Sequence, residues 1–197
     1  MSETSDEQAA RLLFTQARTH SQWQARPVSE ALLRQLYDLL KCGPTSMNTQ
    51  PLRIQFVVSD AAKERLLPCL NEANRAKSRS APVVAILGQD MASPDLLPRL
   101  FAHKADARAY YEGKPDVTAS TALRNSSLQG GYLIMASRLL GLDCGPKSGF
   151  DAAAVDRAFW AGTQVRSNIL CNLGHGDATQ LKPRVPRLDW HEVCQIV

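Results

Sequence analysis

The sequence of 197 residues lacks several features that would assign it to common classes of protein. No apolar run is long enough to cross a bilayer, and the polar, acidic segment 1–7 is unlike a secretory signal. No Gly-x-Gly-x-x-Gly fingerprint is present, which argues against a separate dinucleotide-binding domain. Basic residues are scattered without interleaved aromatic residues, so the net charge of +4 does not indicate a nucleic-acid partner.

Cysteine pairing motifs are absent as well. The five cysteines are odd in number and no two are spaced as Cys-x-x-Cys, which predicts reduced thiols and a cytoplasmic location. The four histidines form no metal-ligand pattern, and we expect no metal site. A hydrophobic fraction of 44%, without repeats or linkers, predicts that residues 1–197 form a single domain.

Hydrophobic periodicity predicts a mixture of helices and strands. Ser29 is suited to cap a helix whose leucines recur at helical spacing, and Gly43 and Pro44 end it. A short strand after Leu142, followed by a turn at 145–146, is also expected, whereas 91–113 looks irregular. The other predicted helices are 5–18, 60–70, 117–140 and 152–160, and the other predicted strands are 52–58, 83–87 and 165–173.

The loop between residues 43 and 51 is the most informative stretch. It offers hydroxyl and amide groups without net charge from Thr45, Ser46, Asn48 and Gln50. Such groups suit a polar ligand held by many neutral hydrogen bonds. They equally suit an ordinary helix-to-strand connection, in which they cap backbone groups.

The run Pro44-Thr45-Ser46-Met47-Asn48-Thr49-Gln50-Pro51 resembles the Pro-Ser-Ser-x-Asn-x-Gln-Pro signature of the nitroreductase family, whose members bind FMN. In that family the loop joins an N-terminal helix to the first core strand and reaches across a dimer interface to the flavin. The resemblance therefore implies that FMN is contacted by Pro44, Thr45, Ser46 and Asn48.

The segment that begins at Arg18 resembles a second element of the family, a basic Arg-Ser motif followed by an aromatic residue and a Pro-Val pair. Arg18 and Thr19 match the motif and Trp23 matches the aromatic residue, whereas Ser21 replaces a second basic residue. The resemblance implies that Arg18, Thr19 and His20 bind the cofactor. Without the family, Arg18 would be interpreted as a cation at a helix C-terminus.

Two elements resemble the parts of the family that approach the flavin ring. Asn74 and Lys77 match an Asn and a Lys that precede a core strand, and a lysine near N1 and O2 would stabilise the anionic reduced ring. The loop with Pro146, Ser148 and Gly149 matches one whose backbone faces the ring. In isolation, Lys77 would be an ordinary solvated lysine.

The C-terminal segment resembles the family's Lys-x-Arg-x-Pro motif, whose cations bind the FMN phosphate. Lys182, Arg184 and Pro186 match it in register. Read alone, this motif is a basic surface loop. In the irregular segment 91–113, His103 and Arg108 could bind a substrate carboxylate, or the segment could be a surface excursion.

Taken together, the resemblance implies an α+β nitroreductase-like fold, with a mostly antiparallel central sheet flanked by helices, in an intertwined homodimer. It also implies that NAD(P)H reduces FMN at N5 and that an acceptor is then reduced at the same site. Within the family, the chain most resembles the malonic semialdehyde reductases of uracil degradation, which form 3-hydroxypropanoate. A broad nitro or quinone reductase and a non-catalytic flavin-binding protein are the alternatives, and the sequence requires no single catalytic residue.

Overall fold

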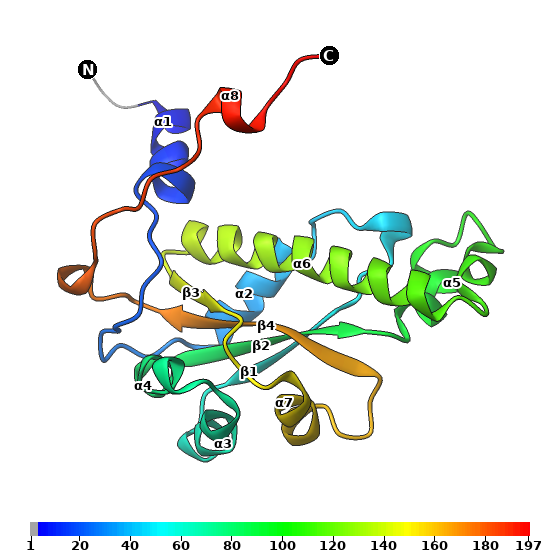
Figure 1. Ribbon diagram of the computed structural model, residues 1–197, viewed down its shortest axis with the longest axis horizontal. Coiled ribbons are helices and arrows are strands. Elements are labelled where there is room, and N and C mark those ends of the chain that lie inside the picture. The colour runs from blue at the N-terminus through cyan, green and yellow to red at the C-terminus, as the bar shows by residue number, and fades with distance from the viewer. Residues whose placement is uncertain (1–3) are drawn as a thin grey trace.

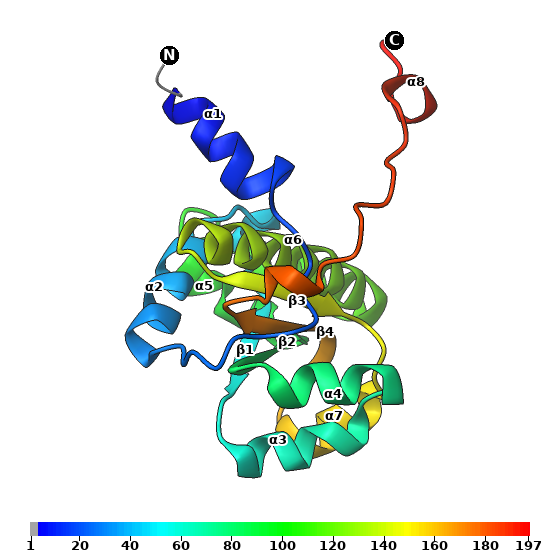
Figure 2. The same ribbon diagram turned by 90° about the vertical axis from the view of Figure 1, so that its left-hand side faces the viewer.

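The protein, seen here as a computed structural model, is described over residues 4–197 (Figure 1). A central sheet carries helices on both faces, and both ends of the chain extend away from this body (Figure 2). Part of the acidic start considered above, residues 1–3, lies outside the described residues. No helix in the described part is long and apolar enough to cross a membrane.

The sheet contains four strands in the order β1-β2-β4-β3, and every neighbouring pair is antiparallel. The second strand is longer than predicted because it continues past a register shift between Leu87 and Gly88. The predicted turn at 145–146 is wrong: both residues lie within β3, where an edge position tolerates a proline that cannot donate. The strands are β1 (Leu52–Val57), β2 (Val83–Asp90), β3 (Asp143–Lys147) and β4 (Val165–Gly174).

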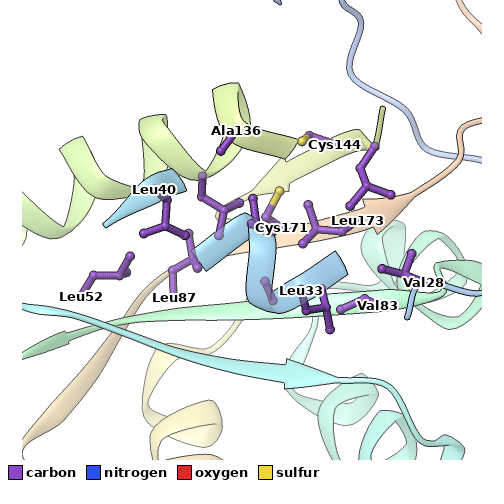
Figure 3. Packing of buried hydrophobic residues seen from close by; sticks show 14 residues of the cluster. Val28, Leu33, Leu40, Leu52, Val83, Leu87, Ala136, Cys144, Cys171 and Leu173 are labelled. Carbon is purple, nitrogen blue, oxygen red and sulfur yellow. The ribbon is translucent and has the colours of Figure 1, made fainter. Parts of the chain in front are cut away.

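One face of the sheet is covered by α2 (Glu30–Leu40) and the long helix α6 (Pro115–Leu139). Their buried leucines meet Leu87 of β2 and Leu173 of β4, as Figure 3 shows. Ser29 caps α2 as predicted, because its side chain accepts a hydrogen bond from the amide of Leu32 at 3.2 Å.

The opposite face is covered by α3 (Asp60–Leu66), α4 (Glu72–Ser80) and α7 (Ala152–Phe159). A 3-10 turn, Leu67–Cys69, follows α3 and replaces the last turn of the predicted helix 60–70. Asp151 caps α7 by accepting from the amide of Ala154 at 3.0 Å. The alternating side chains of β2 therefore serve two cores, with Val84 and Ile86 on this side of the sheet.

The irregular segment 91–113 contains only short helical pieces. These are the 3-10 turn Ser93–Leu96, α5 (Leu97–Leu100) and the 3-10 turn Ala107–Tyr111. They pack around Leu97, Ala107 and Tyr111 at the end of α6 that lies away from β3 (Figure 1).

The two terminal segments bury almost nothing against the body. The predicted helix 5–18 is shorter than expected: α1 (Ser5–Ala10) continues as a π-helical turn over Arg11–Thr15 and stops there. At the other end, a 3-10 turn, Ala178–Gln180, is followed by an extended stretch and α8 (Trp190–Val193). Neither α1 nor α8 contains a buried residue, and both project from the same side (Figure 2).

Candidate functional site

Four arginines line one cavity of about 340 Å³ where the N-terminal segment, the end of α6 and the C-terminal segment meet. Arg18 and Arg184 were expected from the sequence to share a ligand, and the fold brings them together here. Arg138 and Arg187 were not expected. The other lining residues are Phe14, Ala17, Thr19, Pro183 and Val185.

The two expected arginines are held by backbone carbonyl groups. Arg18 donates from Nη2 to the carbonyl oxygen of Lys182. Arg184 donates from Nη2 to the carbonyl oxygens of Thr15 and Ala17, each at 2.8 Å. These contacts tie the N-terminal segment to the C-terminal segment. The side chain of Lys182 itself is exposed, and it is the backbone of this residue that contacts Arg18.

The two unexpected arginines make the same kind of contact. Arg138, in the last turn of α6, donates from Nη1 to the carbonyl oxygen of Leu13 at 2.7 Å, and Arg187 donates to the carbonyl oxygens of Val185 and Pro186 at 3.0 and 3.1 Å. In the part of the chain that the structure describes, none of the four arginines forms an ion pair. A cavity with four uncompensated guanidinium groups suits an anion, and guanidinium donors suit phosphate in particular.

Thr19 and His20 lie next to this cavity but differ in exposure. Thr19 lines it and forms a parallel bridge to Cys144 of β3. His20 is only 7% exposed, and its Nε2 lies 3.3 Å from Oδ1 of Asp143. Its ring packs on Gly176, where an added Cβ would lie 1.9 Å from Nδ1. The side chain of His20 therefore holds the N-terminal segment against β3.

A second group of expected residues gathers where α4 meets the end of β3. Asn74 donates from Nδ2 to the carbonyl oxygen of Gly149 at 2.9 Å, and the amide of Asn71 donates to the same oxygen at 3.1 Å. A Cβ on Gly149 would lie 2.6 Å from Nδ2 of Asn74, so a larger residue would break this contact. Lys77 and Ser148 are both exposed here, as is the neighbouring Pro146.

Lys147 is a charged residue of this region that the sequence did not single out. Its partly buried Nζ donates to Oγ of Ser78 at 2.6 Å and to Oδ1 of Asn172. Asn172 in turn donates from Nδ2 to the carbonyl oxygen of Lys77 at 2.9 Å. Burial lowers the pKa of Lys147 to about 8, an effect that the charge of Lys77 reinforces and the thiol of Cys171 opposes.

The loop that carries the family signature is fixed at a different place. The amide of Ser46 donates to Oδ1 of the buried Asn125 at 2.8 Å, and Asn48 donates to the carbonyl oxygen of Leu100 at 2.8 Å. Asn125 and Arg138 belong to the same helix, α6, and at about 1.5 Å per residue they lie roughly 20 Å apart. The loop is therefore not part of the arginine cavity of its own chain.

The backbone of this loop is strained. Met47, Asn48 and Gln50 have φ values of 50°, 51° and 41°, in the left-handed region that residues other than glycine seldom adopt. Local hydrogen bonds maintain the conformation: the amide of Gln50 donates to Oγ1 of Thr45 at 3.2 Å, and its side chain donates to Oδ1 of Asn48 at 2.7 Å. Strain of this kind is concentrated at functional sites, where surrounding contacts maintain it.

The two expected substrate residues lie apart from both groups. Arg108 donates to Oδ1 of Asp95 at 2.8 Å and to Oε1 of Glu112 at 2.9 Å. His103 is exposed, with its ring 4.0 Å from that of Phe101. Two carboxylates therefore already compensate the charge of Arg108, which makes it less suited to attract a substrate carboxylate.

Residues 15–175 match a family model described as "Nitroreductase family". The chain belongs to the nitroreductase family. The match ends before Lys182 and Arg184, so the part these residues play rests on the geometry described above.

Relatives of similar length support the assignment. A protein from Leptothrix cholodnii is 51% identical over 197 residues, which is 100% of both chains. A protein from Burkholderia lata is 56% identical over 184 residues, which is 93% of this chain and 94% of that protein. Both carry the name "Putative NADH dehydrogenase/NAD(P)H nitroreductase".

Solved structures confirm the predicted nitroreductase-like fold. A "putative nitroreductase" of Bacillus subtilis superposes with a TM-score of 0.87 at 20% identity, covering 94% of this chain and 97% of that one. A second, from Exiguobacterium sibiricum in complex with FMN, gives 0.85 at 19% identity, with 100% and 99% covered. At these identities the likeness shows the fold alone.

Proposed function

We propose that the protein is an FMN-dependent NAD(P)H oxidoreductase. The observation that carries this proposal is the cavity lined by four arginines whose side chains donate to backbone carbonyl groups. FMN offers a phosphate of matching charge, and hydrogen bonds between guanidinium and phosphate are strong and directional. The name shared by the relatives and the FMN complex of a structural neighbour support the same cofactor and hydride donor.

The arrangement of the two groups of residues suits an elongated ligand. Strand β3 connects them, because it bridges to Thr19 near its start and leads to Ser148 at its end. Five residues of strand span roughly 17 Å at about 3.4 Å per residue. Arg18 and Arg184, helped by Lys182, would hold a phosphate at one end, and Asn74, Lys77 and the backbone at 148–149 would lie at the other.

FMN, when bound, supplies the hydride chemistry, and the residues of the chain bind and orient it. Lys77 would supply a cation near the ring, where it would stabilise the negative charge of the reduced form. Gly149 lets the backbone of this loop pack closely against Asn74 and Asn71, which would fix the loop beside the ligand. One site used first by NAD(P)H and then by the acceptor accords with the absence of a separate dinucleotide fingerprint from the sequence.

We propose that two copies of the chain form a homodimer in which the loop 44–50 of one copy completes the site of the other. Within one chain this loop lies far from the arginine cavity, yet it is strained and held in place. Apolar side chains at both ends of the chain are exposed: Phe14 is 61% exposed and Trp190 67%. The outer face of α6 also exposes Leu128 and Tyr132. A second copy would bury these surfaces.

Two classes of acceptor are compatible with this site. The likeness of the sequence to malonic semialdehyde reductases supports a short aldehyde acid. The name of the relatives supports a nitroaromatic compound or a quinone, and the engagement of Arg108 by Asp95 and Glu112 favours this broader class. We propose both as candidates, because the same reduced flavin serves either.

The decisive experiment begins with the purified protein and its bound cofactor, identified by mass after release. NADH or NADPH added under anaerobic conditions should bleach the flavin absorbance. Steady-state rates are then compared for malonic semialdehyde, a nitroaromatic compound and a quinone. A protein without FMN affinity would contradict the proposal, and a bound flavin that neither nucleotide reduces would indicate a non-catalytic flavin-binding protein.

A further inference from the structure

Lys147 is partly buried behind the residues that we assign to the flavin ring, and hydrogen bonds to neutral side chains hold its ammonium group. Its ammonium group donates to Ser78 of α4 and to Asn172 of β4. Among residues 4–197, neither Lys147 nor Lys77 takes part in an ion pair. The charges of Lys147 and Lys77 therefore repel each other, and Lys147 is partly withdrawn from water. A negative charge nearby would offset this repulsion.

The hydrogen bonds of Lys147 link it directly to that part of the site. Ser78 donates to the carbonyl oxygen of Asn74, whose side chain holds Gly149. Asn172, which accepts from Lys147, donates to the carbonyl oxygen of Lys77. Lys147 therefore fixes the end of α4 and the loop at 148–149 at the same time, and it precedes this loop directly in sequence.

We propose that Lys147 is a positioning residue that raises the reduction potential of bound FMN, by holding Lys77 and the loop at 148–149 in place and by adding a second positive charge behind them. The inference rests on the proposed function, because it concerns the same cofactor. Reduction adds negative charge to the ring, so a nearby cation stabilises the reduced form more than the oxidised form. A partly buried cation is screened less by water and salt than an exposed one.

Lys147 is the group whose protonation we expect to change when the ring is reduced. The charged and titratable side chains that face it are Lys77 and Cys171. Lys77 of α4 is exposed, and Cys171 of β4 is buried, with the pKa of its thiol raised by a hydrogen bond with Cys144 and by burial. This thiol therefore stays neutral near pH 8. The pKa of Lys147 itself lies near 8, so the negative charge of a reduced ring would favour its protonated form.

The test compares three variants of the FMN-bound protein. Lys147→Met removes the charge and keeps an unbranched side chain, and Lys147→Arg keeps the charge. Lys63→Met removes a lysine of α3 that donates to the carbonyl oxygen of Arg79. The midpoint potential of the flavin is measured against a reference dye at pH 7, together with the dissociation constant of oxidised FMN and the melting temperature.

In Lys147→Met we expect the preference for reduced over oxidised FMN to fall about tenfold, which lowers the potential by about 30 mV for two electrons. Lys147→Arg and Lys63→Met should stay near the wild type. If Lys147→Met melts at a lower temperature but keeps the wild-type potential, the residue is purely structural and the inference is wrong. If the wild-type protein binds no FMN, the proposed function itself is wrong.

The wild-type protein provides an independent readout, which also applies if Lys147→Met does not fold. Above pH 8, reduction should draw a proton onto Lys147, and the potential should then fall more steeply with pH, by about 30 mV per pH unit for the extra proton. Lys147→Arg should lack this change of slope, because arginine does not titrate there. A wild-type slope without a break between pH 7 and 10 would overturn the inference.

Discussion

Arg184 donates a hydrogen bond to the carbonyl oxygen of Ala17 at 2.8 Å. The contact connects the C-terminal segment to the residue just before Arg18, so Arg184 and Arg18, two of the four arginines of the cavity, are held beside each other. Neither terminal segment buries a helix residue against the body. Their alignment therefore depends on a few charged side chains and their carbonyl acceptors.

Arg184→Ala should weaken FMN binding roughly ten- to a hundredfold. A hydrogen bond to a charged group is worth about 1.5–3 kcal/mol, and about 1.4 kcal/mol corresponds to a factor of ten. Riboflavin shares the ring and lacks the phosphate, so its weaker affinity should hardly change. Titration of the cofactor-free variant with both ligands separates the phosphate contact from general damage.

A matched control for this prediction is Arg34→Ala, which removes an exposed arginine of α2 that pairs with Glu30. It should leave both affinities unchanged. Equal losses of FMN and riboflavin in Arg184→Ala would instead show that its contacts with Thr15 and Ala17 support the fold of the N-terminal segment.

Lys77→Ala should slow reduction of the flavin more than it weakens binding of oxidised FMN. The side chain is exposed in the last turn of α4, and its charge interacts mainly with the reduced, anionic ring. The midpoint potential should fall, and stopped-flow reduction by NAD(P)H should be slower at saturating cofactor. An unchanged potential would remove Lys77 from the ring site.

Asn125→Ala should loosen the loop 44–50 without unfolding the protein. The substitution removes the acceptor of the Ser46 amide, while Asn125→Asp keeps an oxygen at the same place. Hydrogen exchange at residues 46–50 should become faster in the alanine variant and stay slower in the aspartate variant. Equal exchange in both variants would mean that the strained backbone is maintained by the contacts within the loop alone.

The protein should be a dimer that loses FMN on dilution. Each site would take residues from both chains, so separation of the chains would remove the loop 44–50 from the ligand. Analytical ultracentrifugation with detection at the flavin absorbance should show coloured dimer and colourless monomer. Trp190→Glu should shift the equilibrium towards monomer, because this apolar side chain is 67% exposed in one chain and lies outside the arginine cavity. A coloured monomer would argue against a shared site.

The stability of the cofactor-free protein should rise between pH 8 and 10 because of Lys147. The pKa of this lysine is lowered from 10.5 to about 8, so in this range the unfolded chain binds a proton that the folded chain does not. The contribution is complete above pH 10.5 and is lost as the pH falls through about 8. Relative to Lys147→Met, the free energy of unfolding should increase by roughly 1 kcal/mol per pH unit. A constant difference in urea denaturation would contradict this.

Local signals in the sequence predicted most of the fold. Ser29 caps a helix as expected, and the predicted strand 52–58 corresponds to β1. The errors arose where local and tertiary preferences differ. Gly145 and Pro146 have the composition of a turn, but hydrogen bonds from β4 and a place at the sheet edge keep them in β3.

The candidate site could be predicted only in part, because its residues come from distant segments. Motifs gave Arg18 and Arg184, whereas Arg138, in the last turn of α6, belongs to no motif and reaches the cavity only in the fold. Lys147 gave no signal because its environment depends on Ser78 and Asn172, which are far away in sequence. The two carboxylates that engage Arg108 were likewise invisible to motif matching.

Strand β1 lies at the edge of the sheet, and this position affects the risk of aggregation during folding. Among the described residues, β1 pairs with β2 alone, and Ile54 and Phe56 are partly exposed beside its open side. Such an edge can accept a strand from any neighbouring chain, which is the first step of aggregation. Its charged residue, Arg53, is turned towards Asp90 at 2.6 Å and gives limited protection. The edge at β1 is therefore a place where aggregation of newly made chains can begin.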